Sequence, residues 1–314
     1  MQLNYIGLYS ITQLLTSYLS NRTQYVKIGN SVSESEIIAC GVSQGSILGP
    51  LLFTIYVNSI FHLYQDSLII GYADDTSITF AADNASDLYK KANDCMNIIY
   101  KWLCSASLSL NTKKTKYIHY SFYTSSKTNT FGTIKIHRIS CVRNHDCHCD
   151  VLEKAEVVKY LGIYFDKNIN WKYHITYLTR KLRFCYFMLC KLRRSCSRKT
   201  LRIVYFSFFQ SHIQYCVTSF GGAFPSVFST SFNLQKKCLK IISNVNHYSN
   251  INELYVINKI LPIKQLYYYR IFCYYLRNKD IFALVPSCSQ RLTNYSLQPF
   301  LVNTSRGKQC LNFR

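Results

Sequence analysis

The spacing of apolar residues along the first part of the chain predicts helices and strands in alternation. Apolar side chains recur at helical intervals from Leu8 to Leu19, and residues 25–28 then alternate as a strand does. A glycine-punctuated loop follows at 41–50, and Pro50 suits the first turn of a helix that runs towards Leu63. This pattern predicts a region of mixed α and β structure.

An apolar run rich in β-branched residues, from Ile69 to Phe80, is interrupted at its centre by the adjacent acids Asp74 and Asp75. Such a run predicts two short strands that meet at a tight turn. Beyond it, apolar positions spaced about 3.5 residues apart predict an amphipathic helix. These positions are Leu88, Ala92, Cys95, Ile99 and Trp102.

Near position 170 the pattern changes from mixed elements to mainly helices. The segments 108–120 and 157–165 are expected to contain strands, with a polar insertion between them. From Trp171 to Leu192, apolar residues keep helical spacing and basic residues crowd their flanks. The basic residues are Arg180, Lys181, Arg183, Arg193, Arg194, Arg198 and Lys199.

The chain is strongly basic, with 37 Lys and Arg against 15 Asp and Glu and a formal net charge of +22 over 314 residues. A field of this sign attracts polyanions and releases their counterions on binding, so nucleic acid is the expected partner. A chain that is basic for solubility, or that touches acidic lipid, is the alternative. Two uncharged stretches, 37–65 and 203–235, contain polar side chains that are costly in hydrocarbon, so we expect no membrane span.

The 14 cysteines have no framework spacing, and the opening residues lack the features of a secretory leader. This favours thiols in a reducing compartment, and we expect an intracellular location, in the nucleus or cytoplasm. One cluster between predicted strands contains Cys141, His145, Cys147, His148 and Cys149. Thiolate and imidazole are the usual zinc ligands, but the spacing is irregular, so we interpret the cluster as a loop insertion, with zinc as the alternative.

Asp74 and Asp75 are the candidate metal ligands. Mg²⁺ binds oxygen, usually from one or two carboxylates, and completes its octahedron with water and substrate phosphate. A two-metal centre activates an attacking hydroxyl and steadies the leaving group, and it requires carboxylates on a rigid strand end. A solvated turn is the alternative interpretation of this pair.

Four sequence blocks in a fixed order carry a resemblance to a known family. The blocks are Gly41-Val42-Ser43-Gln44-Gly45-Ser46-Ile47-Leu48-Gly49-Pro50-Leu51-Leu52-Phe53, Tyr72-Ala73-Asp74-Asp75, Leu110-Asn111 with Lys114-Thr115, and Lys159-Tyr160-Leu161-Gly162. Their order resembles the reverse transcriptases of non-LTR (LINE-type) retrotransposons, from roughly Leu3 to Ile242. The resemblance implies an RNA-directed DNA polymerase, a nucleotidyltransferase that uses Mg²⁺ or Mn²⁺ and acts on an RNA template, a DNA primer and dNTP.

The resemblance also implies roles for single residues. Asp74 and Asp75 match the catalytic metal-binding pair, and Tyr72 lies where the family has a residue near the primer end. The glycine-rich loop matches the one under the incoming nucleotide and its template partner. Its substrate-binding residues are Gly41, Gln44, Gly45 and Ser46. Glycine permits close backbone approach and glutamine offers a donor and an acceptor, whereas a helix-entry loop is the alternative.

Two further blocks match residues that handle phosphates and the primer. Lys114 matches a catalytic lysine near the departing phosphates, where a cation offsets developing charge or supplies a proton, and a solvated lysine is the alternative. The second block resembles the primer grip, and a core strand that closes on a glycine is its alternative. Its residues are Lys159, Tyr160, Leu161 and Gly162. The basic segment 171–202 resembles the thumb, which tracks duplex phosphates, and a solvated helix face is the competing account.

Departures from the family's pattern bear on the expected activity. Family members carry another catalytic Asp in a strand upstream of the segment that residues 1–22 resemble. Ser43 replaces a usual Pro, Ser59 a usual Asp, and Phe220 a usual Trp. We therefore expect an N-terminally truncated copy that is inactive as an isolated chain. A catalytically dead remnant that retains only nucleic-acid binding is the alternative to a polymerase.

The expected fold class is α+β: a partial right-hand polymerase palm, with an antiparallel sheet and packed helices, followed by an α-helical thumb. The expected domains are the partial palm at 1–170, the thumb at 171–245 and a C-terminal post-thumb region at 246–314. The sequence leaves open the clade, the template specificity and the oligomeric state.

Overall fold

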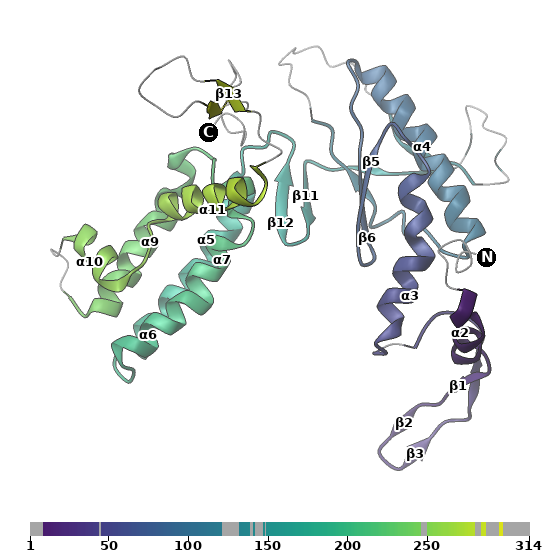
Figure 1. Ribbon diagram of the computed structural model, residues 1–314, viewed down its shortest axis with the longest axis horizontal. Helices are drawn as coiled ribbons and strands as arrows, with labels where there is room; N and C mark the ends of the chain where they lie inside the picture. The colour runs from purple at the N-terminus through teal and green to yellow at the C-terminus, as the bar shows by residue number, and fades with distance from the viewer. Residues whose placement is uncertain are drawn as a thin grey trace. The chain divides into compact units, whose positions relative to one another are not determined.

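The structure, a computed structural model, divides the chain into two compact units (Figure 1). It describes residues 9–43, 45–120, 132–138, 141, 147, 149–245 and 250–279, and the backbone of 284–286 and 295–297. Unit 1 comprises Met1–Lys116 and Ser126–Glu153, and unit 2 comprises Tyr117–Ser125 and Lys154–Arg314. The predicted domain boundaries at 170 and 245 stay predictions.

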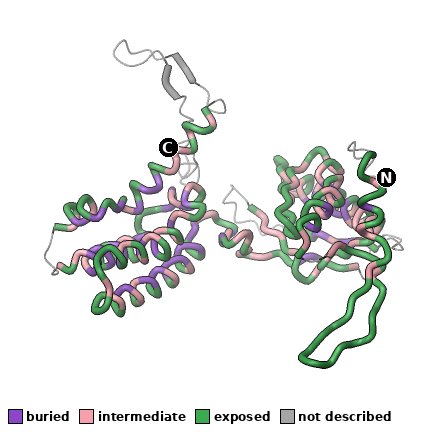
Figure 2. Tube along the Cα trace, turned by 60° about the horizontal axis from the view of Figure 1, so that its bottom comes forward, coloured by how far each residue is buried: buried purple, intermediate pink, exposed green. Residues whose placement is uncertain are grey.

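Unit 1 begins with a short helix and an exposed arm of paired strands. The helix α2 (Thr12–Leu19) follows a 3-10 turn, η1 (Tyr9–Ile11), and buries Leu15. The paired strands of the arm are β1 (Arg22–Gln24) with β4 (Glu36–Ile38), and β2 (Lys27–Ile28) with β3 (Ser31–Val32). Most residues of this arm are exposed, as Figure 2 shows. The predicted helix and strand are both confirmed.

The central part of unit 1 combines two helices with a hairpin. Helix α3 (Leu48–Val57) continues into a 3-10 turn, η2 (Asn58–His62), and Pro50 lies in its first turn, as predicted. The other elements are β5 (Leu68–Tyr72), β6 (Asp75–Thr79) and α4 (Ala85–Ser105). Asn84 caps α4, because its side chain accepts a hydrogen bond from the Asp87 backbone amide at 2.8 Å.

A small core joins the hairpin to the helices of unit 1. Ile69 and Ile78 are paired across β5 and β6 and pack against buried residues of η2 and α4. The buried members are Ile60, Cys95 and Ile99. Two of these, Cys95 and Ile99, belong to the apolar face that the sequence predicts for α4.

Every sheet within the described ranges has two strands. In unit 1, β8 (Lys135–Ile136) pairs with β9 (Asp150–Val151), and β7 (Lys116–Tyr117) and β10 (Glu153–Lys154) lie where the chain passes between units. The α+β class is confirmed, but the described residues do not join into one antiparallel sheet. Local alternation sets which strands form a hairpin; it does not determine which hairpins join.

Unit 2 is mainly helical. It starts with the hairpin of β11 (Val157–Tyr160) and β12 (Ile163–Asp166). Its helices are α5 (Lys172–Leu192), α6 (Arg198–Val204), α7 (Ser211–Gln214), α8 (Val217–Phe220), α9 (Pro225–Ser243), α10 (Ile251–Asn258) and α11 (Ile263–Arg277). A π-helical segment, η3 (Tyr205–Gln210), joins α6 to α7 without a break. Two further strands, β13 (Leu284–Pro286) and β14 (Tyr295–Leu297), pair with each other.

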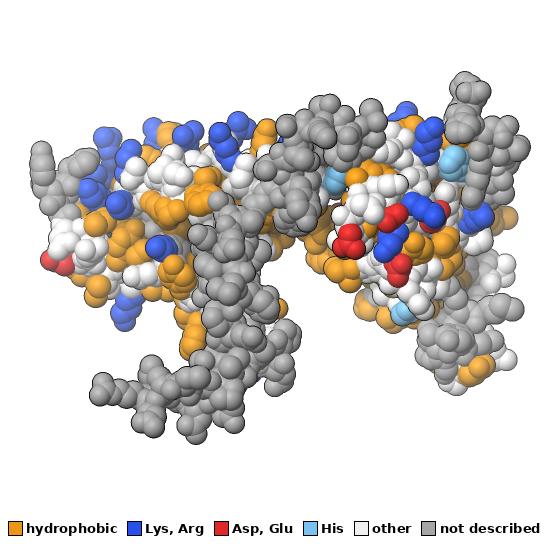
Figure 3. Space-filling view, turned by 90° about the horizontal axis from the view of Figure 1, so that it is seen from above, with side chains coloured by type: hydrophobic (Ala, Val, Ile, Leu, Met, Phe, Trp, Pro, Cys, Tyr) orange, Lys and Arg blue, Asp and Glu red, His pale blue; other side chains and the backbone are white. Residues whose placement is uncertain are grey.

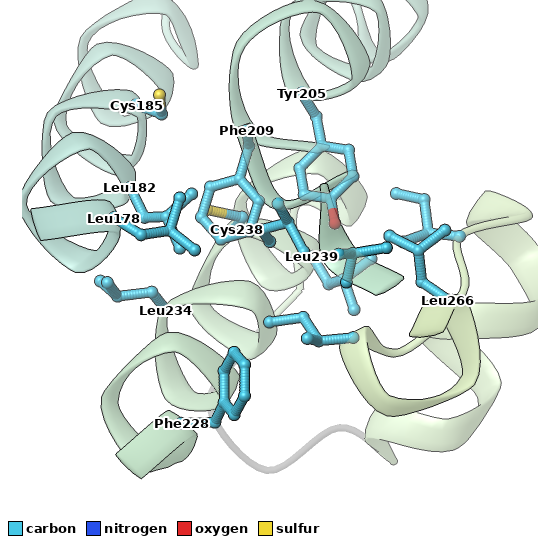
Figure 4. Packing of buried hydrophobic residues seen from close by; sticks show 14 of the residues in the cluster. Leu178, Leu182, Cys185, Tyr205, Phe209, Phe228, Leu234, Cys238, Leu239 and Leu266 are labelled. Atoms are coloured by element: carbon cyan, nitrogen blue, oxygen red, sulfur yellow. The ribbon is translucent and has the colours of Figure 1, made fainter. Parts of the chain in front are cut away.

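The core of unit 2 forms where α5, η3 and α9 meet (Figure 4). Helix α5 buries the apolar positions that its periodicity predicts, including Leu178, Leu182 and Cys185. From α9, Leu234 and Cys238 face the same core. None of the helices in the described part of the chain combines the length and apolar character needed to cross a membrane.

Candidate active site

Asp74 and Asp75 lie at the tip of the β5–β6 hairpin, where the sequence predicts them. Tyr72 pairs with Asp75, so Ala73 and Asp74 form a two-residue turn. Ala73 has a φ of 53°, the left-handed conformation that primed hairpin turns need at their first central position. Tyr72, Asp74 and Asp75 are all exposed. The hairpin therefore presents both carboxylates and one aromatic ring to solvent.

Contacts below the hairpin hold it in place. A Cβ on Gly71 would lie 2.6 Å from Phe61 Cζ, so glycine gives this ring the room to pack under the strand. The Trp102 indole donates a hydrogen bond to Ser59 Oγ at 3.1 Å. Ser59 therefore ties η2 to α4.

The two acids fit a divalent cation that keeps most of its ligands as water and phosphate. Mg²⁺ is typically bound through one or two carboxylates together with substrate phosphates. In the described part of the chain, no third His, Cys, Asp or Glu joins Asp74 and Asp75 in a metal-binding group. The described residues thus offer two protein ligands at this position.

The glycine-rich loop before α3 has the open backbone that its sequence indicates. Gly41 and Gly45 have φ angles of 80° and 79°, a region that glycine adopts readily. Apart from the adjoining residues, no atom of the described part of the chain lies within 4 Å of a Cβ built on either glycine. Arg22 fixes the start of the loop, because its Nη2 donates to Gly41 O at 2.6 Å. Gln44 lies outside the described residues.

Two other predicted site residues lie in local hydrogen-bonded turns. Ser46 Oγ donates to Ser43 O at 2.7 Å and accepts from the Gly49 amide at 3.0 Å, so this hydroxyl organises the start of α3. Lys114 is exposed, and its backbone amide donates to the Asn111 side chain at 3.1 Å. Among the described residues, no hydrogen bond or ion pair joins the Lys114 side chain to the hairpin acids.

In unit 2 the β11–β12 hairpin contains the predicted primer-grip residues. Tyr160 pairs with Ile163, and the turn residues Leu161 and Gly162 have φ angles of 45° and 81°. Two positive φ angles define the type I′ turn, which glycine favours at the second position. The Tyr215 hydroxyl donates to Leu161 O at 2.7 Å and so ties the turn to the helices.

Lys159 belongs to a cluster of cations and aromatic rings on unit 2. Its ammonium lies 5.8 Å from the ring centroid of Tyr164 and 5.7 Å from that of Tyr177. Lys181 lies 4.8 Å from the Tyr177 centroid, and its hydrogen bond to that hydroxyl holds the pKa of Tyr177 below its usual value. Such clusters can contact phosphates and stack against bases.

The basic residues of α5, α6 and the turn between them divide into two groups. Arg193 Nη2 donates to Asn244 Oδ1 at 2.7 Å, and Arg198 Nη2 donates to Asn258 Oδ1 at 3.1 Å, so both stabilise the fold. Other cations of this segment are exposed, and Figure 3 shows Lys and Arg side chains gathered along the helical unit. They include Arg180, Arg183, Arg194 and Lys199.

One residue of this region, His137, is not indicated by the sequence pattern. The structure brings it beside Cys141, Cys147 and Cys149, whereas His145 and His148, which the sequence groups with these cysteines, lie outside the described residues. The signal lies in the strand register: β8 and β9 pair Ile136 with Asp150, so the next opposite positions are 137 and 149.

These observations define the class of protein. A family model described as "Reverse transcriptase (RNA-dependent DNA polymerase)" matches residues 5–165, which include the glycine-rich loop and the hairpin acids. Because the match covers half of the chain, the chain belongs to the reverse transcriptase family. The family generally uses a divalent metal ion, in agreement with the paired carboxylates.

The relatives of the chain are polymerases of non-LTR retrotransposons, which confirms the LINE-type resemblance. It is similar to the probable RNA-directed DNA polymerase from transposon BS of Drosophila melanogaster, with 25% identity over 248 residues that cover 75% of this chain and 26% of that protein. The corresponding polymerase from transposon X-element is 25% identical over 174 residues, or 54% of this chain and 18% of the relative.

The RNA-directed DNA polymerase from mobile element jockey of Drosophila melanogaster is 24% identical over 177 residues, which cover 54% of this chain and 18% of that polymerase. The chain thus spans about a quarter of the transposon BS polymerase and less of the other two. No solved structure matches the chain significantly.

Proposed function

We propose that this chain supplies the metal-binding hairpin of an RNA-directed DNA polymerase, with Asp74 and Asp75 as ligands of Mg²⁺ or Mn²⁺. The observation that carries the proposal is the pair of exposed carboxylates at a tight strand turn inside the segment that matches the reverse transcriptase family. The relatives are named RNA-directed DNA polymerases, so the proposed substrates are an RNA template, a DNA primer and dNTP.

The proposed roles follow from the local geometry. Bound divalent ions would supply charge neutralisation and activation of the primer hydroxyl. The open backbone at Gly41 and Gly45 can approach a nucleotide closely, and exposed Lys114 can offset charge on the departing phosphates. In this proposal unit 1 contributes the palm, and the helices of unit 2 contribute the thumb.

The β11–β12 turn is the proposed primer grip. Its type I′ geometry and the hydrogen bond from Tyr215 give a rigid edge, and Lys159 places a cation among aromatic rings beside it. A primer terminus presents both phosphates and a base, and this cluster offers partners for each.

Primer extension by an intact polymerase that contains this segment, on a primed RNA template with Mg²⁺ and then with Mn²⁺, tests the metal assignment. In that context we expect Asp74→Asn and Asp75→Asn each to reduce extension by roughly two orders of magnitude or more, because amides lack the charge that holds the ions. Template binding, measured by fluorescence anisotropy, should stay unchanged. The matched control is Asp83→Asn, an exposed acid in the loop that follows β6.

Normal turnover in either hairpin variant would remove the metal assignment. Selective broadening of the amide signals of residues 73–75 by Mn²⁺, with primed RNA and dNTP present, provides an independent readout. If the signals of the hairpin remain sharp at saturating Mn²⁺, the assignment is wrong whatever the activity.

A second candidate function is nucleic-acid binding without nucleotide transfer. The net charge of +22 favours it, because phosphate neutralisation does not need the acidic pair. Salt-sensitive binding of primed RNA, combined with no extension in either metal, would support this function over the first. Extension that depends on both acids would support the polymerase.

A further inference from the structure

The strongest unassigned feature of the chain is a cluster of soft ligands in unit 1. It consists of His137, Cys141, Cys147 and Cys149, whose ligand atoms all lie within 4.8 Å of one another. All four residues are half-buried, and no other such group of three or more His, Cys, Asp or Glu occurs in the described ranges. We call these residues the Cys₃His cluster.

A hairpin builds the cluster. Strands β8 and β9 pair Lys135 with Val151 and Ile136 with Asp150, so His137 and Cys149 are the next opposite residues. Cys147 lies two residues before Cys149, a spacing that returns to the same face of an extended chain. The Cys141 backbone amide donates to Arg138 O at 2.9 Å, which holds Cys141 near His137.

Helix α4 anchors this hairpin through two asparagines on one helix face. Asn93 Oδ1 accepts from the Lys135 amide at 2.8 Å, and Asn93 Nδ2 donates to Thr133 O at 3.0 Å. One turn later, Asn97 Oδ1 accepts from the His137 amide at 3.4 Å. Ile136, at the centre of these contacts, is 1% exposed. The hairpin that carries His137 is therefore fixed by the fold on one side.

The distances match those of one tetrahedral ion. His137 Nδ1 lies 3.6 Å from Cys141 Sγ and 3.5 Å from Cys147 Sγ. With zinc bonds of about 2.3 Å to sulfur and 2.0–2.1 Å to nitrogen, two ligand atoms of a tetrahedron are about 3.5 Å apart. The same nitrogen faces both thiols, so Nδ1 is the ligating atom of the imidazole. A hydrogen bond from the Arg138 backbone amide to Cys149 orients that thiol from outside the cluster.

We propose that His137, Cys141, Cys147 and Cys149 form a structural Zn²⁺ site that closes the β8–β9 hairpin. Three thiols lose their protons to solvent on binding, and the neutral imidazole donates its Nδ1 lone pair. Four protein ligands fill the tetrahedron, as is typical of structural rather than catalytic zinc. A two-iron cluster would distribute the ligands over two metal ions, whereas these ligand atoms all lie within 4.8 Å of one another, which favours a single ion.

Cobalt substitution tests the site in the full chain. The chain is purified with its metal, stripped under reducing conditions, and titrated with Co²⁺ and then Zn²⁺. We expect one equivalent of Co²⁺ to give the intense visible bands of tetrahedral thiolate coordination, and one equivalent of Zn²⁺ to remove them. Metal analysis of the untreated protein should give one zinc per chain.

Matched variants separate this site from the other thiols. Cys147→Ser and Cys149→Ser should each lose the tetrahedral cobalt spectrum, whereas Cys40→Ser and Cys190→Ser, at exposed positions outside the cluster, should keep it. Because a cysteine variant can lose its fold, His137→Cys provides the positive case. It supplies a fourth thiolate, so it should keep one equivalent of metal with a shifted charge-transfer band, whereas His137→Ala should bind far more weakly.

Four outcomes would overturn the proposal. The first is no stoichiometric zinc and no tetrahedral cobalt spectrum in the reduced chain. The second is an unchanged spectrum in Cys147→Ser or Cys149→Ser, which would locate the metal elsewhere. The third is loss of the spectrum in His145→Ala or His148→Ala while His137→Ala keeps it, which would remove His137 from the ligand set. Recovery of the cluster cysteines as a disulfide from freshly reduced protein in the presence of zinc would also contradict it.

Discussion

His174 is an ionisable side chain that unit 2 holds in its interior. It is 4% exposed, and its ring lies against Phe220 with the ring centroids 4.6 Å apart. Burial, together with the charge of Lys181, lowers the pKa of His174 to about 4. The folded chain therefore holds a neutral imidazole under conditions where an exposed histidine is already protonated.

This burial predicts a loss of stability in mild acid. Between about pH 6.5 and 4 the unfolded chain binds a proton at this position that the folded chain does not, so the free energy of unfolding falls as the pH falls. Above the pKa of the unfolded chain the stability is fully retained. The loss in the free energy of unfolding from this one residue, once the pH has fallen through the folded pKa, is at most about 3 kcal/mol. Urea unfolding of the chain and of His174→Phe across this window should show a smaller acid-side loss in the variant. His62→Gln, at an exposed site, is the control, and equal losses in all three proteins would contradict the prediction.

At the residue scale, functional residues that are adjacent in the sequence could be predicted. Residues that are brought together by strand pairing or by long-range contacts could not. Asp74 and Asp75 are adjacent, and the turn signal around them sufficed to place them at a hairpin tip. His137 joins its cysteines through strand register, and Tyr215 reaches the Leu161 carbonyl from the turn that follows α7, far along the chain. Neither contact leaves a local pattern that a single sequence reveals.

Helix α9 carries a buried amide that links three other elements of unit 2. Gln235 is 2% exposed, and its Nε2 donates to the Tyr205 hydroxyl at 2.9 Å and to Leu261 O at 3.0 Å. Its Oε1 accepts from the Tyr255 hydroxyl at 3.0 Å and from the Ile263 amide at 3.1 Å. All four hydrogen-bonding capacities of the amide are used, which makes it a junction between helices.

Replacing this junction by an apolar side chain should be costly. Gln235→Leu removes a partner from two hydroxyls, one carbonyl and one amide in a buried setting, so we expect a loss of about 3 kcal/mol in the free energy of unfolding. Gln265→Leu, on the exposed face of α11, should change stability by less than about 0.5 kcal/mol. Denaturant unfolding measures both. A loss below 1 kcal/mol for Gln235→Leu would show that the network contributes little.

At the scale of elements, periodicity sufficed for the long helices. The apolar spacing of α4 and α5 predicted the residues that they bury, because a helix face is set by positions close in sequence. The prediction of one antiparallel sheet was wrong for the described residues, because their strands form separate two-stranded pairs. The combination of hairpins depends on contacts far apart in the chain, and short strands carry little information about it.

The charge of the whole chain predicts how it meets nucleic acid. Arg183, Arg193 and Arg194 are all exposed, but the Arg193 guanidinium donates two hydrogen bonds to Asn244 Oδ1. Only side chains that neutralise phosphates add to the salt dependence of binding. This distinction separates cations that hold the fold from cations that hold a ligand.

Binding of an RNA–DNA duplex should weaken steeply with salt. If Arg183 and Arg194 each contact one phosphate, Arg183→Gln combined with Arg194→Gln should lower the slope of log affinity against log salt by roughly 2. Arg193→Gln, on the neighbouring position, should lower stability and leave the slope unchanged. Fluorescence anisotropy between about 0.05 and 0.2 M salt measures the slope. A slope near zero for the unsubstituted chain would exclude phosphate neutralisation as the purpose of the charge.

At the scale of the molecule, the order of four sequence blocks was enough for the family, and the match over residues 5–165 confirms it. The net charge of +22 led us to expect nucleic acid as the partner. The division into units could not be predicted, because residues 117–125 group with unit 2 although they precede a segment of unit 1.

The π-helical segment η3 has a consequence for how this chain is aligned with others. A wide turn accommodates one more residue than a regular α-helical turn, so the sequence spacing of the buried positions is lengthened by one residue between α6 and α7 although no loop separates them. Deleting a single residue between 205 and 210 should therefore convert the wide turn into a regular α-helical turn and leave the two halves of the helix facing the same way. Homologues without the wide turn would therefore show a one-residue gap inside an unbroken helix.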